Sequence, residues 1–121
     1  MRRLILLSLA LLALTAAAAA PASASTVADC QTEIAALDAA TASAQFFGQN
    51  ADKSRTGLRG KLADASAKLD EGKFADATVK LTQFRDQVAA LAGQGKLAST
   101  DADTLTMLAN DAIACISPIA A

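Results

Sequence analysis

A helical repeat of apolar residues runs through the chain beyond Ser25 and constrains its fold more than any other feature. In four segments, apolar side chains recur every three or four positions, and none of the segments shows the sustained alternation that is typical of a strand. Breaks that contain glycine separate the segments at 48–50, at Gly72 and at 93–95. The pattern therefore predicts an all-α chain of four helices.

Each segment carries one apolar stripe that we expect to face a shared core. The first segment should end near Phe46-Phe47, and Gly72 should cap the second. Ser99-Thr100 should cap the fourth, and Pro118 should prevent much continuation of it. The predicted stripes are Val27, Cys30, Ile34, Leu37, Thr41 and Ala44; Leu58, Leu62, Ala65 and Leu69; Phe74, Ala77, Leu81, Phe84, Val88 and Leu91; and Leu105, Leu108, Ala112, Cys115 and Ile116.

The connections between the segments are short, which favours antiparallel neighbours and an up-down-up-down four-helix bundle. In that topology the start of the first helix lies beside the end of the fourth. The only two cysteines, Cys30 and Cys115, fall at those two places. We therefore predict a disulfide between them, which the chain-entropy model values at about 4 to 5 kcal/mol for a loop this long. A redox-active thiol pair, the alternative, favours closer spacing.

The first 24 residues have the pattern of an export signal. Arg2 and Arg3 precede an uncharged run over 4–20, and small residues at Ala22 and Ala24 favour cleavage after Ala24. An uncleaved membrane anchor is the alternative, but the run would span only about 25 Å, less than a hydrocarbon core of about 30 Å. We expect a signal peptide over 1–24, a single domain over 25–121, and a secreted protein, extracellular or periplasmic.

Charge and composition argue against several classes of function. Without Arg2 and Arg3, nine basic residues face twelve acidic ones, a net charge of −3. That balance provides no basic field for nucleic acid, and we expect no stable membrane insertion after cleavage. The chain has no histidine, tryptophan or tyrosine, which removes His-dependent nucleophiles, His metal ligands and the usual stacking platforms. We predict no cofactor, no metal site and no enzyme activity.

Four fragments that look like functional motifs have simpler interpretations. Asp101-Ala102-Asp103 opens like a calcium loop but lacks the later glycine, so we expect a helix start. Gly95-Lys96 lacks the other residues of a phosphate loop and is expected to be a turn. Asp70-Glu71 is expected to be a solvated helix end. Nothing in the spacing of Lys61 and Ser66 favours a nucleophile pair.

Phe46 and Phe47 are adjacent, so their side chains should point in different directions. One of them is then a candidate contact on the surface. The alternative is that both pack under the end of the bundle.

The region from Leu58 to Ile116 resembles the FIMAH type of bacterial extracellular helical module. The resemblance rests on Lys61-Leu62, Ala65, Leu69, Gly72, Ala77, Leu81, Phe84, Val88, Gly95-Lys96-Leu97, Ala102, Leu105 and Ala109. It implies an appendage for attachment or interaction with no catalytic motif, although this chain adds a cysteine-bearing first helix.

Export, the disulfide, the residue inventory and the resemblance favour a non-catalytic interaction or attachment domain. Its partner would be an extracellular protein or an envelope polymer such as a polysaccharide. Two alternatives stay open: a carrier of a small apolar ligand in a cavity of the bundle, and an inhibitor of a secreted enzyme.

Overall fold

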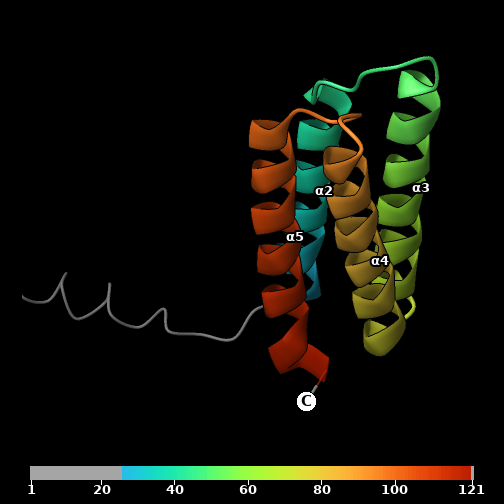
Figure 1. Ribbon diagram of the computed structural model, residues 1–121. Coiled ribbons are helices and arrows are strands. Elements are labelled where there is room, and N and C mark those ends of the chain that lie inside the picture. The colour runs from blue at the N-terminus through green and yellow to red at the C-terminus, as the bar shows by residue number, and fades with distance from the viewer. Residues whose placement is uncertain (1–25, 121) are drawn as a thin grey trace, which may run out of the picture.

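The computed structural model describes residues 26–120 and shows four helices and no strand among them. The helices are α2 (Val27–Ser43), α3 (Ala51–Asp70), α4 (Phe74–Gly93) and α5 (Ser99–Ala120). Each helix packs against two others, in the cycle α2, α3, α4, α5 and back to α2 (Figure 1). The predicted all-α, up-down-up-down bundle is confirmed, while the predicted signal peptide lies outside the described residues.

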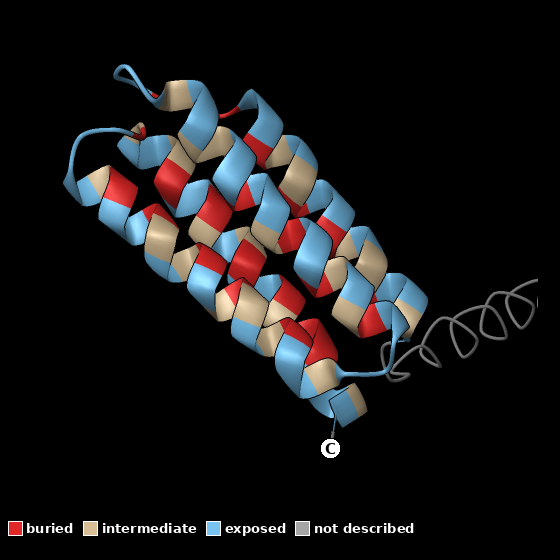
Figure 2. Cartoon of the chain, turned by 90° about the vertical axis from the view of Figure 1, so that its right-hand side faces the viewer, coloured by how far each residue is buried: buried red, intermediate tan, exposed pale blue. Residues whose placement is uncertain are grey.

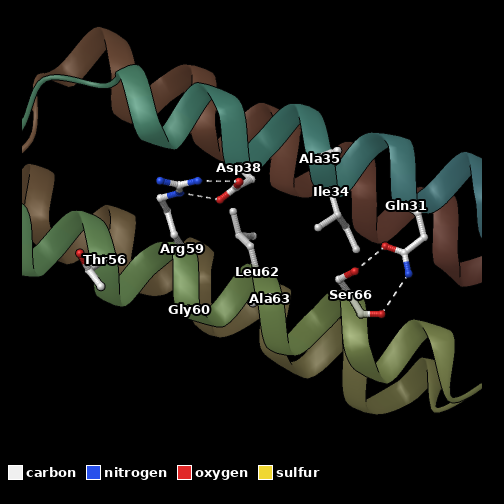
Figure 3. A pocket seen from close by; sticks show the side chains of 10 residues that line it. All are labelled: Gln31, Ile34, Ala35, Asp38, Thr56, Arg59, Gly60, Leu62, Ala63 and Ser66. Carbon is white, nitrogen blue, oxygen red and sulfur yellow. Dashed lines mark hydrogen bonds and ion pairs between the residues drawn. The ribbon is translucent and has the colours of Figure 1, made fainter.

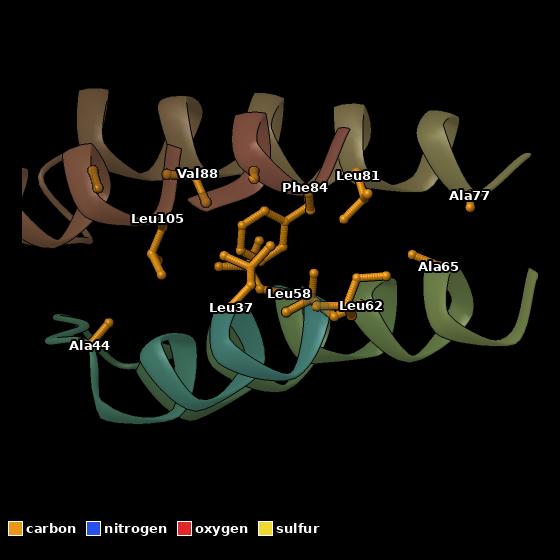
Figure 4. Close-up of a cluster of buried hydrophobic side chains, with 14 of the residues drawn as sticks. Leu37, Ala44, Leu58, Leu62, Ala65, Ala77, Leu81, Phe84, Val88 and Leu105 are labelled. Atoms are coloured by element: carbon orange, nitrogen blue, oxygen red, sulfur yellow. The ribbon is translucent and has the colours of Figure 1, made fainter. Parts of the chain in front are cut away.

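The core is a continuous cluster of aliphatic side chains around one aromatic ring. Figure 2 shows the buried residues along the inward faces of the helices. Phe84 is fully buried, and its ring reaches from α4 toward Leu37 of α2 and Leu58 of α3 (Figure 4). The one buried polar side chain in the described part, Thr41, donates its hydroxyl hydrogen to the Leu37 carbonyl at 2.8 Å.

Most of the predicted stripe residues are buried, and the exceptions lie at the margins of the core. Val27, Phe74 and Leu108 are only partly buried and pack against its edge. The buried members are Cys30, Ile34, Leu37, Thr41, Ala44, Leu58, Leu62, Ala65, Leu69, Ala77, Leu81, Phe84, Val88, Leu91, Leu105, Ala112, Cys115 and Ile116, joined by Phe46, Leu97, Ala102 and Ala109.

The pair α2 and α5 is fastened at both ends. At one end, the disulfide end, Cys30 is bonded to Cys115 with their Cα atoms 5.5 Å apart, which confirms the predicted pairing. At the other, the loop end, residues 44–50 meet residues 94–98. There the Phe47 amide donates to the Lys96 carbonyl at 2.9 Å, and the Ala98 amide donates to the Gln45 carbonyl at 3.0 Å.

The predicted end of the first helix is wrong by about three residues. α2 stops at Ser43, and Ala44 is already extended. The helix ends early because of a tertiary contact. Phe46 is buried and pairs with Leu97 in an isolated antiparallel bridge. The Arg55 guanidinium, on α3, lies 5.0 Å from the centroid of the Phe46 ring. It also donates a hydrogen bond to the Ala44 carbonyl.

The start of the fourth helix also differs from the prediction. Ser99 and Thr100 are helical rather than capping, because α5 begins at Ser99 and the first helical hydrogen bond runs from Ala102 to the Ala98 carbonyl. Pro118 lies inside α5, but the helix ends at Ala120, in agreement with the predicted lack of much continuation. Proline removes one helical hydrogen bond, but Ile119 packs against the core and favours continuation.

The glycine predicted to end α3 does so. Gly72 has φ +77, a left-handed conformation that glycine adopts without steric cost. It allows the Lys73 amide to donate back to the Lys68 carbonyl at 2.8 Å. The turn reverses the chain into α4 and so sets the antiparallel packing of the two helices.

Candidate functional site

A groove lies between α2 and α3 in the described part of the chain. Its volume is about 540 Å³, within the roughly 300–1,000 Å³ of ligand pockets. We call it the α2–α3 groove. It is lined by Gln31, Ile34, Ala35, Asp38, Thr56, Arg59, Gly60, Leu62, Ala63 and Ser66 (Figure 3).

The floor of the groove consists of apolar residues, and several exposed residues around it are small. Ile34 and Leu62 form the floor, but they belong to the core and are almost fully covered, at 3% and 1% exposed. Ala35, Gly60 and Ala63 are exposed around it. A Cβ added at Gly60 would meet no heavy atom within 4 Å, so this glycine is not required by close packing. The position of its missing side chain faces open space.

An ion pair crosses the groove toward the loop end. The Arg59 guanidinium donates from Nε and Nη2 to the two carboxylate oxygens of Asp38, at 2.8 and 3.0 Å. The hydrogen bond from Arg59 lowers the pKa of Asp38, and the same bond raises the pKa of Arg59. Both groups are therefore ionised at neutral pH, and the forked geometry fixes the two helices relative to each other.

A second polar link crosses the groove toward the disulfide end. The Gln31 amide nitrogen donates to the Ser66 carbonyl at 3.0 Å and to the Asp70 carboxylate at 2.7 Å. The Ser66 hydroxyl donates back to the Gln31 amide oxygen at 2.7 Å. Figure 3 shows Ile34 and Leu62 between this link and the ion pair. The apolar floor is thus bounded along the helices by two polar links.

The two candidate contact residues have different environments. Phe46 is 8% exposed and belongs to the core, whereas Phe47 is 47% exposed. Phe47 lines a smaller hollow of about 210 Å³ at the loop end with Gly48 and Lys96. The structure does not bring either phenylalanine to the α2–α3 groove.

The motif-like fragments occupy ordinary structural positions. Asp101 lies in the first turn of α5. Its carboxylate accepts a hydrogen bond from the backbone N–H of Gln45 at 2.8 Å. Asp70 accepts from Gln31, and Glu71 pairs with Lys73 at 3.2 Å. Between residues 26 and 120, no group of three or more acidic or cysteine side chains could hold a metal ion.

An ion pair forms between two helices where the sequence spacing would allow two pairs within helices. The sequence places Asp64 four residues before Lys68 and Asp76 four residues before Lys80. Instead, Asp64 of α3 pairs with Lys80 of α4 at 4.0 Å. Antiparallel packing brings these two side chains to the same level, and sequence spacing alone does not show that.

Sequence reasoning missed the α2–α3 groove, although one signal pointed to it. Gly57 and Gly60 interrupt a helical segment, and a glycine there costs up to about 1 kcal/mol relative to alanine. Neither glycine has a positive φ, so the helix does not need them for its conformation. Only Gly60 lines the groove, whereas Gly57 faces the Gln87 side chain of α4, so the two glycines alone do not locate the groove.

Comparison with known proteins gives no match among family models, curated proteins or solved structures. The resemblance to FIMAH-type modules stays a prediction. Between residues 26 and 120, no helix is long and apolar enough to cross a membrane.

Proposed function

We propose that this chain is a non-catalytic binding domain that holds a segment of a partner protein in the α2–α3 groove. One observation carries the proposal: the groove exposes the small residues Ala35, Gly60 and Ala63 between two polar links that join both helices. Concave sites with an apolar floor and a few placed polar groups are the usual form of binding sites.

The polar links across the groove also support binding. The two walls of the groove are joined through five side chains, Asp38 with Arg59 and Gln31 with Ser66 and Asp70. A preformed site loses less conformational entropy on binding than a flexible one. The lack of histidine in the sequence further supports a role other than catalysis.

The alternative of a small-ligand carrier in the centre of the bundle has less support. The space between the four helices is occupied by Phe84 and the aliphatic side chains around it (Figure 4). Inhibition of a secreted enzyme is one form of the protein-binding function, and it would appear as a stoichiometric loss of that enzyme's activity.

Two glycines on α3 allow a matched test. Gly60→Leu should fill the groove, whereas Gly57→Leu changes the same residue type one turn away, where an added Cβ meets the Gln87 side chain only at 3.8 Å. Immobilised, disulfide-bonded wild-type protein and both variants are incubated with secreted and envelope fractions of the host cells. Bound proteins are then quantified by mass spectrometry.

We expect at least one protein to be retained by the wild type and by Gly57→Leu and to be lost from Gly60→Leu. Retention of the same proteins by all three forms would contradict a role for the groove. Retention of a polysaccharide in place of a protein would contradict the proposed class of partner.

A further inference from the structure

The helix α2 is packed less strongly than the three helices around it. It buries two large apolar side chains, Ile34 and Leu37, together with Cys30 and the polar Thr41. By comparison, α3 buries three leucines, and α4 buries Phe84 with two leucines and a valine. α5 buries a leucine and an isoleucine and packs three further large aliphatic residues against the edge of the core. α2 therefore gains the least stability from apolar burial.

The polar links from α2 to α3 add little to this packing. The side chains of Asp38 and Arg59 are 37% and 47% exposed, and exposed ion pairs contribute little to stability. The hydrogen bond from Gln31 to Asp70 also lies at the surface. The docking of α2 therefore depends strongly on how its two ends are held.

The two ends of α2 are held by different kinds of contact. At the loop end several non-covalent contacts act together: Phe46 is buried, the Ala98 amide donates to the Gln45 carbonyl, and the Gln45 backbone N–H donates to Asp101. At the disulfide end one covalent bond joins α2 to α5, and Val27 is only partly buried there. A reductant breaks the bond at the disulfide end and leaves the contacts at the loop end intact.

We propose that the disulfide is a redox switch that controls the docking of α2. When the disulfide is reduced, α2 opens away from α3 and α5 about residues 44–50, while α3, α4 and α5 stay packed. At low temperature the closed bundle remains the main state, and the open form exchanges with it. The switch does not depend on the binding function proposed above.

Reduction of the switch requires a dithiol as the co-reactant. One thiolate of the dithiol attacks a sulfur of the disulfide, the S–S bond breaks, and the other cysteine leaves as a thiolate. The second thiol of the reductant then displaces the cysteine that it holds. Two electrons and two protons pass to Cys30 and Cys115, which become thiols, and the dithiol becomes a disulfide.

Opening of α2 changes the surface of the protein in two ways. It uncovers the ring of Phe84, which reaches toward Leu37 in the closed bundle (Figure 4). It also separates the walls of the α2–α3 groove, because α2 supplies one of them. The reduced protein therefore exposes apolar surface that the oxidised protein covers.

Hydrogen exchange followed by mass spectrometry tests the switch on the oxidised protein and on the protein reduced with dithiothreitol. On reduction, amides of residues 30–43 should exchange about thirtyfold faster or more, the effect of losing a typical disulfide. Their exchange should depend weakly on urea, because opening of one helix exposes little surface. Amides of α4 should stay better protected and depend more steeply on urea. Dithiothreitol should not change exchange in a Cys30→Ala/Cys115→Ala variant.

Gly57→Ala separates opening of α2 from unfolding of the whole bundle. This substitution stabilises α3, which is helical in both the closed and the open form. In the reduced protein it should slow exchange in α4 about two- to fivefold and leave exchange in α2 unchanged.

Two results would overturn the proposal. In the first, α2 and α4 of the reduced protein exchange at equal rates with equal urea dependence and are both slowed by Gly57→Ala, so the bundle opens as one unit. In the second, exchange in α2 is unchanged on reduction, so the disulfide does not control its docking.

Discussion

Gly57 and Gly60 lower the stability of α3, because glycine inside a helix is less favourable than alanine. Both lie inside α3, and a Cβ at Gly60 would meet no neighbour. Gly60→Ala should therefore raise the free energy of unfolding by about 0.5–1 kcal/mol, because alanine loses less backbone entropy on folding. Gly57→Ala should do the same. Urea unfolding measures both changes.

Gly72 provides the opposite control, because its φ of +77 disfavours any residue with a Cβ. Gly72→Ala should lower the free energy of unfolding. A lower stability for Gly60→Ala would show that the groove surface is packed more tightly than the structure indicates.

The pair of Asp38 and Arg59 predicts a pH dependence. The folded protein lowers the pKa of Asp38, so its ionised carboxylate stabilises the folded state. This contribution is complete above the unfolded pKa of about 3.9 and is lost as the pH falls through the lower folded pKa. Asp38→Asn should be slightly less stable than wild type at pH 7, and the difference should vanish in acid.

The effect should be small, because both side chains are more than a third exposed. Urea unfolding between pH 7 and pH 2.5 measures it, with the same substitution in an Arg59→Gln background as the control. An Asp38→Asn difference that does not vary with pH, or one that persists in that background, would contradict the assignment.

At the scale of elements, the connections at the loop end depend on one carboxylate of α5. The Asp101 carboxylate accepts a hydrogen bond from the backbone N–H of Gln45 at 2.8 Å. This bond links the segment after α2 to the start of α5. Asp101→Ala should lower the free energy of unfolding by about 1 kcal/mol, the usual net value of such a hydrogen bond. Thermal unfolding followed by circular dichroism measures the loss.

Asp103 is the matched control, since it is an exposed acidic residue two positions along the same helix. Asp103→Ala should change stability by no more than about 0.5 kcal/mol. Equal effects of the two substitutions would mean that the contact with Gln45 contributes nothing.

The helices could be predicted from the sequence because apolar periodicity and glycine breaks are local signals. Gly72 marked the end of α3, and the Phe84 stripe marked the inward face of α4. The end of α2 could not be predicted, because Phe46 leaves the helix to pair with Leu97, a residue distant in sequence. The groove was missed for a similar reason: Asp38 and Arg59 meet only when two helices are packed.

At the scale of the whole molecule, the disulfide joins α2 to α5. Replacing both Cys30 and Cys115 by alanine should lower the free energy of unfolding by about 2–4 kcal/mol. For a domain of this size that lowers Tm by about ten degrees or more. Helicity at low temperature should persist, because the remaining core residues are unchanged.

Circular dichroism of the double variant, compared with reduced wild-type protein, measures this effect. Wild-type protein should lose a similar amount of stability when it is reduced. An unchanged Tm in both cases would show that packing alone holds α2 against α5.

The assignment of binding to the α2–α3 groove is tested most directly by nuclear magnetic resonance. The labelled, disulfide-bonded protein is titrated with the partner retained by the wild type, and changes in amide chemical shift are mapped onto the bundle. The account predicts that the largest changes fall at Ala35, Gly60 and Ala63. Changes centred on Phe47 and Lys96 at the loop end, with the groove unaffected, would contradict it.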